Sequence, residues 1–191
     1  VKRFKKISDN YNMQKQKHIF FTVIFFLIFG QTVFSQNTND LPNGYANIQL
    51  GMSVEETKEQ LLKNSDFGYH GDRDVSLVPE KNQVLIETDA DKGLGSNFLT
   101  TSYFQFHNDQ LYVITINLNK EKIDHYSIFT TLKEKYGEPL SVTPEKSVWK
   151  NDFVTMTLEK PLTLKYINNQ IYEELQQYSA VQKSAEEITQ Q

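Results

Sequence analysis

The sequence predicts an α+β fold in which helices pack on one face of an antiparallel sheet. Three observations predict it: helix-start and helix-stop motifs recur, apolar residues alternate with a period of two in the intervening segments, and turn residues separate those segments at hairpin spacing. The 191 residues suffice for one domain with a modest core. We expect either one sheet or two fused helix-plus-sheet units, followed by a C-terminal helix.

Residues 1–35 are typical of a secretory signal peptide. Basic residues precede an apolar run from Ile19 to Phe29, and two small or aliphatic residues, Val33 and Ser35, occupy the −3 and −1 positions. The apolar run is roughly half the length that a membrane-spanning helix needs. We therefore expect cleavage between Ser35 and Gln36, with Met13 as an alternative start of the leader.

Removal of residues 1–35 would change the charge of the chain. The formal charge of −4 becomes −9, because six basic residues and one acidic residue are lost. Such an acidic domain is disfavoured at nucleic-acid phosphates and anionic lipid, so we expect no nucleic-acid partner. We also expect no stable membrane span once the leader, with its short apolar run, is removed. The chain has no cysteine for a disulfide or a lipid anchor. We expect an exported protein, periplasmic or secreted, that is not a lipoprotein.

The folded domain is expected over residues 45–168, after a flexible lead-in over 36–44. Its first unit, about 45–119, opens with an S-x-x-E capping box from Ser53 to Glu56, which predicts a helix up to Asn64. Apolar positions then recur at helical spacing: Val54, Thr57, Leu61 and Leu62. Two short strands near Val75 and Val84 follow.

A hairpin completes the first unit, with strands over Phe98–His107 and Leu111–Leu118 around Asn108-Asp109. The second unit, about 120–168, starts with a helix from about Lys122 or Asp124 to Tyr136. Gly137 and Pro139 end it. We expect this helix to bury four side chains: Tyr126, Phe129, Leu132 and Tyr136.

Three strands and a terminal helix are expected after the second helix. The strands cover Val148–Lys150, Val154–Glu159 and Leu162–Tyr166, and Asn151-Asp152 turns between the first two. Residues 169–191 predict an amphipathic helix that frays at its end. Its apolar positions lie three and four apart: Ile171, Leu175, Tyr178, Val181, Ala185 and Ile188. Packing on its own domain and a coiled-coil or partner-binding role both fit this pattern, so it does not predict an oligomeric state.

Catalytic and metal-binding patterns are weak. The three histidines after the leader lie on different predicted elements: His70, His107 and His125. Asp72 and Asp74 lie beside His70, and Asp89-x-Asp91-x-Gly93 departs from an EF-hand loop at three places. Dinucleotide, Walker A and nucleophile-elbow motifs do not occur. We expect no catalytic residue, no cofactor and no metal site, with a weak Ca²⁺ site on the acidic loop and a carboxylate-pair enzyme as less favoured alternatives.

Four aromatic side chains on predicted strands are candidates for an interaction surface: Trp149, Tyr103, Tyr112 and Tyr166. Core packing is the favoured interpretation for Trp149, the sole tryptophan, and an exposed hot spot is the alternative. If several of the four lie exposed on the sheet face that no helix covers, that face is a binding surface.

The helix motifs resemble those of a known family. Ile48-x-Leu50-Gly51-Met52-Ser53-x-Glu55-Glu56 resembles the helix-opening element of the BamE (SmpA/OmlA) outer-membrane assembly lipoproteins, and Leu132-x-x-x-Tyr136-Gly137-x-Pro139 with Trp149 looks like the stretch after their helix. A tandem of such units is the architecture of the β-lactamase inhibitor proteins. The chain departs in lacking a lipobox cysteine, and its first helix ends at Asn64-Ser65 without Gly-x-Pro. The resemblance implies a non-catalytic envelope domain that binds another protein through one sheet face or loop.

We therefore expect a non-catalytic protein-binding envelope or secreted module, of the assembly-factor or inhibitor kind, whose partner is another envelope or extracellular protein. The alternative is a small-ligand or lipid carrier with an apolar cleft. A binding module requires an exposed patch on a sheet face or loop. A carrier requires a concave and mostly apolar pocket.

Overall fold

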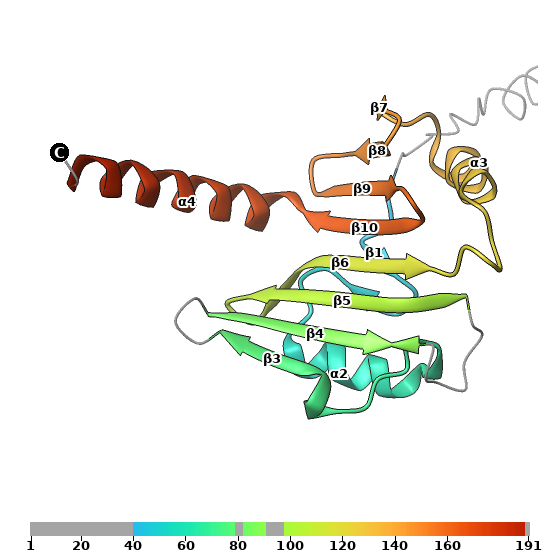
Figure 1. Cartoon of the computed structure of the whole chain (residues 1–191), viewed down its shortest axis with the longest axis horizontal. Coiled ribbons are helices and arrows are strands. Elements are labelled where there is room, and N and C mark those ends of the chain that lie inside the picture. The colour runs from blue at the N-terminus through green and yellow to red at the C-terminus, as the bar shows by residue number, and fades with distance from the viewer. Residues whose placement is uncertain (1–39, 79–81, 91–97, 190–191) are drawn as a thin grey trace, which may run out of the picture. The chain divides into compact units, whose positions relative to one another are not determined.

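Eight antiparallel strands form one sheet in the computed structural model, which describes residues 40–78, 82–90 and 98–189, with side chains as far as Ala180. The predicted signal peptide lies outside these residues, as do residues 91–97 of the acidic loop. The strands are β3 (Val75–Val78), β4 (Gln83–Asp89), β5 (Leu99–His107), β6 (Gln110–Leu118), β7 (Ser141–Val142), β8 (Lys146–Lys150), β9 (Val154–Glu159) and β10 (Thr163–Asn168). Their order is β3-β4-β5-β6-β10-β9-β8-β7 (Figure 1).

Three α-helices and a small second sheet complete the described part of the chain. The helices are α2 (Val54–Lys63), α3 (His125–Tyr136) and α4 (Asn169–Thr189), and the second sheet pairs β1 (Gly44–Tyr45) with β2 (Ile48–Gln49). Two short 3-10 turns are η1 (Ser65–Phe67) and η2 (Asp72–Asp74). The predicted α+β class is confirmed, and each predicted helix-plus-sheet unit supplies four strands to one continuous sheet. None of the helices in the described residues is long and apolar enough to cross a membrane.

Local motifs set the ends of the first two helices. The Ser53 hydroxyl accepts a hydrogen bond from the Glu56 backbone N–H at 3.2 Å, and the Glu56 carboxylate accepts from the Ser53 N–H at 2.8 Å, so the predicted capping box is confirmed. Asp124 caps α3 through the backbone N–H of Ser127 at 3.0 Å. Gly137 ends α3 at a φ of 82°, which is costly for other residues.

The predicted buried face of α3 is partly wrong. Leu132 is buried and Phe129 and Tyr136 are partly buried against the core, but Tyr126 is 75% exposed. Tyr126 lies outside the helix face that Ile128, Leu132 and Tyr136 share at a spacing of four residues. Phe129 makes the contact to the sheet, with its ring 6.1 Å from that of Trp149.

One row of side chains runs across seven strands on the covered face of the sheet. Each member is the register partner of the next, in this order across the sheet: Val75, Ile86, Phe104, Ile114, Tyr166, Met156 and Trp149. The Phe67 ring packs edge-on against Phe104 with centroids 5.7 Å apart, and Figure 1 shows α2 behind β3 and β4. Paired residues of an antiparallel sheet point to the same face, so this row marks the core side.

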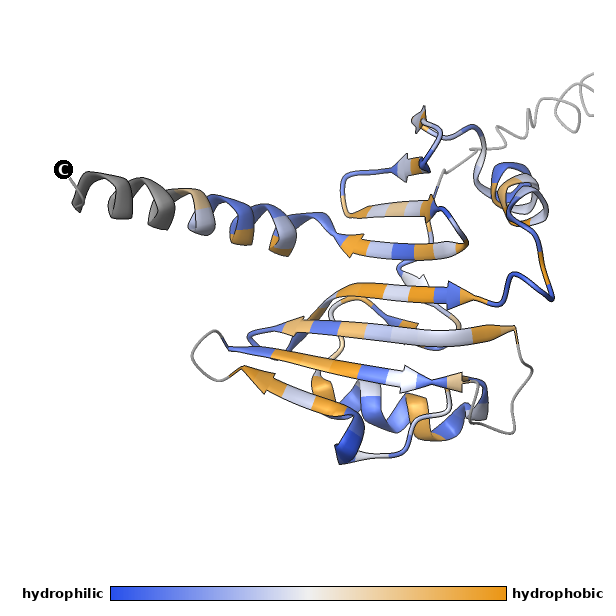
Figure 2. Ribbon diagram, in the orientation of Figure 1, coloured by the Kyte–Doolittle hydropathy of each residue, from blue (hydrophilic) through white to orange (hydrophobic). Residues whose placement is uncertain are grey.

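The alternation along the strands fits a sheet that is covered on one face only. Figure 2 shows hydrophobic and hydrophilic residues alternating along β6 and β10. The β5–β6 hairpin turns at Asn108 and Asp109, whose φ angles of 49° and 60° suit a tight two-residue loop. Strand β7 was not predicted, because two residues are too few to establish a period of two.

Helix α4 packs on the sheet at its beginning. Asn169 and Ile171 are buried, whereas the side chains from Tyr172 to Ala180 are exposed apart from half-buried Leu175. Asn169 fixes the start of the helix, because its amide group donates to the Asn151 carbonyl at 2.8 Å and accepts from the Thr155 hydroxyl at 2.6 Å. Figure 1 shows the remainder of α4 continuing beyond the end of β10.

Candidate functional site

The sheet face opposite α2 and α3 is the most extended feature that could bind a partner. Its first row crosses six strands: Glu87, Tyr103, Thr115, Lys165, Thr157 and Val148. The next row is Leu85, Gln105, Val113, Ile167, Thr155 and Lys150. The third includes Thr101, Asn117, Thr163, Glu159 and Lys146. We call these three rows the open face.

Hydrogen bonds and one ion pair hold the polar side chains of the open face in place. Glu159 accepts from the Thr157 hydroxyl at 2.9 Å and pairs with the Lys165 ammonium at 3.2 Å, with both charged side chains 28–29% exposed. Asn117 donates to the Thr101 hydroxyl at 2.8 Å and accepts from the Thr163 hydroxyl at 2.7 Å. Ordered polar groups of this kind lose little side-chain freedom when a partner binds.

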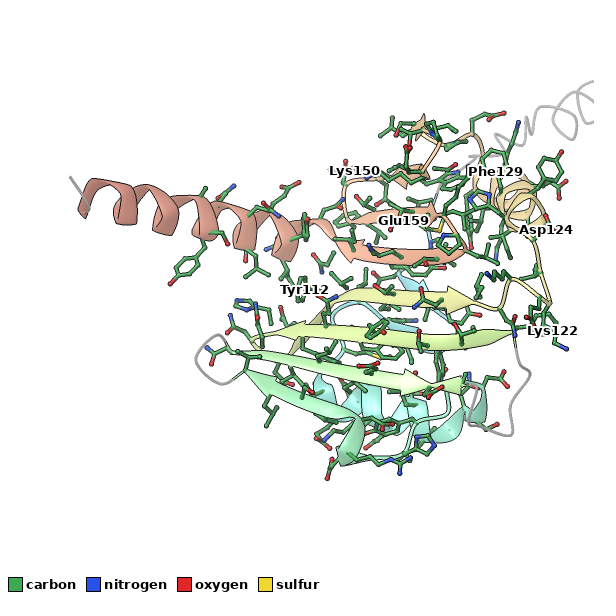
Figure 3. The ribbon with its side chains drawn as sticks, in the orientation of Figure 1. Tyr112, Lys122, Asp124, Phe129, Lys150 and Glu159 are labelled. Carbon is green, nitrogen blue, oxygen red and sulfur yellow. The ribbon has the colours of Figure 1, made fainter. Side chains whose placement is uncertain are left out.

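Tyr103 belongs to the open face, and Tyr112 lies beside it at the register shift in the pairing of β5 with β6. Both are half-buried, and the Tyr112 hydroxyl donates to the Gln105 amide oxygen at 3.4 Å. Burial, and secondarily the nearby Tyr172, raises the pKa of the Tyr112 phenol, so this group stays neutral and keeps its hydrogen at neutral pH. Figure 3 shows Tyr112 on β6 close to the beginning of α4.

Trp149 and Tyr166 are not surface residues, which corrects two of the four candidates. Trp149 is 2% exposed and Tyr166 is 4% exposed, because both belong to the core row on the opposite face. The Trp149 indole N–H donates to the Gly137 carbonyl at 2.9 Å, which supports the core interpretation for this residue. Burial raises the pKa of the Tyr166 phenol.

The acidic turn around His70 lies at the surface, with the Asp72 side chain exposed and the Asp74 side chain mostly buried. His70 Nδ1 lies 3.4 Å from Asp74 Oδ2, and its backbone N–H donates to the same oxygen at 2.7 Å. Asp72 pairs instead with the Lys58 ammonium at 3.1 Å. His107 and His125 lie on other elements, and no group of three or more His, Asp or Glu side chains within the described ranges could hold a metal ion.

Three pockets of moderate size lie around the sheet. One of about 540 Å³ lies where β5 and β10 begin and β6 ends, and Thr101, Asn117 and Thr163 line it. A second of about 480 Å³ lies beside Phe153 in the β8–β9 turn, and a third of about 460 Å³ lies beside Leu77 at the β3 edge. The 540 Å³ pocket has a mainly polar lining, whereas apolar atoms provide most of the exposed lining of the other two, as a carrier would require.

The hydrogen-bonded rows are the part of the site that the sequence interpretation missed. Threonine or asparagine occupies the outward positions of three strands, at Thr115, Asn117, Thr155, Thr157 and Thr163. Threonine favours strands and offers a hydroxyl, so this pattern is visible in the sequence once the strands are predicted. Which of these residues share a row depends on the pairing of β10 with β6 and β9.

Comparisons with known proteins give one match. A family model described as the TP0088 domain matches residues 43–178. No curated protein matches the chain, and no solved structure matches it. Nothing in this match links the chain to the assembly lipoproteins or inhibitor proteins that the helix motifs resemble, so that resemblance stays a prediction.

Proposed function

This chain belongs to the TP0088 domain family, and we propose that it is a non-catalytic, exported module that binds another envelope or extracellular protein across the open face. The observation that carries the proposal is the open face itself, a mostly polar surface that α2 and α3 leave uncovered, with half-buried Tyr103 on it and half-buried Tyr112 beside it where α4 begins. Ordered polar side chains beside tyrosine are typical of protein-binding surfaces.

The size of the open face suits a protein partner. The six strands that carry the open face, at a spacing of about 4.8 Å, span about 29 Å, and about six residues along a strand span about 20 Å. The product, about 580 Å², is close to the lower end of the roughly 600–1,000 Å² that each partner buries in a standard interface. The Glu159–Lys165 pair and Lys150 provide charges on the open face that would select among partners.

Site-specific photo-cross-linking tests the proposal. A benzoylphenylalanine placed at Tyr103 or Tyr112 should cross-link reproducibly to one protein of the native envelope or extracellular fraction. The same probe at Tyr126, which is 75% exposed on α3, is the matched control and should not capture that protein. Equal capture at Tyr126 would show that the open face is not the binding surface.

Two further outcomes test other parts of the proposal. Recovery of no protein at Tyr103 or Tyr112, together with a small molecule that co-purifies with the chain, would support the carrier alternative. Export is tested by N-terminal sequencing of the mature protein. We expect it to begin at Gln36, and a retained N-terminus would contradict export by signal-peptide cleavage.

A further inference from the structure

The geometry points to a second binding site, for a neutral saccharide, in the 540 Å³ pocket at the end of the sheet. This pocket lies where the third row of the open face meets the loops before α3 and before β10. Its polar wall is built from three neighbouring interior strands, β5, β6 and β10. The pocket shares Thr101, Asn117 and Thr163 with the open face, but its test does not require the protein partner proposed above.

A directional chain of hydrogen bonds crosses this wall. Thr163 donates its hydroxyl hydrogen to Asn117 Oδ1 at 2.7 Å, and Asn117 Nδ2 donates to Thr101 Oγ1 at 2.8 Å. Thr101 accepts in this chain and keeps its own hydrogen, while Thr163 donates and keeps lone pairs. The wall therefore presents a donor at Thr101 and an acceptor at Thr163, at most about 8 Å apart because one Asn117 amide group bridges the two hydroxyls.

The charges at the pocket favour a neutral ligand. The side chains of the hydrogen-bonded chain carry no formal charge, and the exposed neighbours Lys120 and Glu121 have opposite charges that offset each other. Leu118, Pro161 and Leu162 add apolar surface to the lining. A sugar ring matches both parts, because its hydroxyl groups donate and accept along one edge while its C–H face packs on apolar side chains.

An extended peptide fits this pocket less well. Peptides that bind to sheets usually pair with the main chain of an exposed edge strand. Strands β5, β6 and β10 are interior strands whose main-chain groups pair with neighbouring strands. The groups that remain available at the pocket are side-chain hydroxyls and amides, which suit the hydroxyls of a saccharide.

Titration followed by amide NMR tests the site with three neutral disaccharides: cellobiose, maltose and N,N′-diacetylchitobiose. We expect at least one of them to shift the resonances of Thr101, Asn117 and Thr163, at concentrations up to about 10 mM, tenfold above a millimolar Kd. Inorganic phosphate and glucuronic acid serve as charged comparators and should bind more weakly. Loss of one hydrogen bond should weaken binding about threefold to tenfold in each of Thr101→Val and Thr163→Val.

Thr115→Val is the matched control, because Thr115 lies on the open face outside the pocket. It should leave saccharide affinity unchanged. The proposal is overturned if none of the disaccharides shifts the pocket resonances of the unmodified protein, if phosphate or glucuronic acid binds more tightly, or if folded Thr101→Val and Thr163→Val proteins bind as well as the Thr115→Val control. The shift map of the unmodified protein decides the question even if a variant fails to fold.

Discussion

Removal of the Phe67 ring should destabilise the domain without altering the open face. Phe67 is fully buried under the covered side of the sheet, and its ring packs edge-on against Phe104 at 5.7 Å and Tyr45 at 6.1 Å. Phe67→Ala would lose the buried area, leave a cavity and break both aromatic contacts. Together these effects should lower the free energy of unfolding by about 4 kcal/mol.

Urea denaturation measures this loss directly. With a slope of about 2 kcal/mol per M, the midpoint should fall by about 2 M while the slope stays the same. The leucine of Phe67→Leu fills most of the space of the ring, so this variant should lower the free energy of unfolding by only about 1 kcal/mol. Leu62→Ala changes a side chain that is 69% exposed, so it should stay within about 0.5 kcal/mol of the unmodified protein.

The reasoning fails if Phe67→Ala lowers the free energy of unfolding no more than Leu62→Ala does, because Phe67 would then not be part of the core. It also fails if the folded Phe67→Ala protein loses the partner cross-link at Tyr103 or Tyr112. In that case, a change in the core on the covered side of the sheet would also alter partner binding at the open face.

Two further predictions concern backbone strain and pH. Gly68 and Gly51 both have positive φ angles, of 63° and 91°. A Cβ added at Gly68 would overlap the Asp89 carbonyl oxygen, whereas a Cβ added at Gly51 would meet open space. Gly68→Ala should therefore lower the melting temperature clearly more than Gly51→Ala, and calorimetry showing equal losses would contradict the packing at Gly68. Hydrogen bonds from the Ser53 backbone and side chain lower the pKa of the Glu56 carboxyl, so its stabilising effect is complete above its unfolded pKa and disappears as the pH falls through its folded pKa. The stability advantage over Glu56→Gln in urea should therefore be larger at neutral pH than in acid, and a pH-independent difference would disprove this role.

Features with nearby partners could be predicted from the sequence, and features that depend on distant pairing could not. The α2 capping box joins Ser53 to Glu56, three residues apart, so its motif contains both partners. By contrast, Tyr166 is a core residue because β10 pairs with β6, which places it beside Ile114. A period of two divides the residues of a strand between two faces but does not identify the face that helices cover.

The place of β10 also has a consequence for the order in which the domain assembles. The last strand in the sequence lies in the interior of the sheet, between β6 and β9, and links the two groups of strands on either side. A chain that emerges with its N-terminus first can form the β3–β6 group and the β7–β9 group as separate hairpins. It cannot unite them until residues 163–168 are free. The two groups of strands therefore stay unjoined, and the hydrophobic side chains that β10 contacts on β6 and β9 stay uncovered, until residues 163–168 are in place.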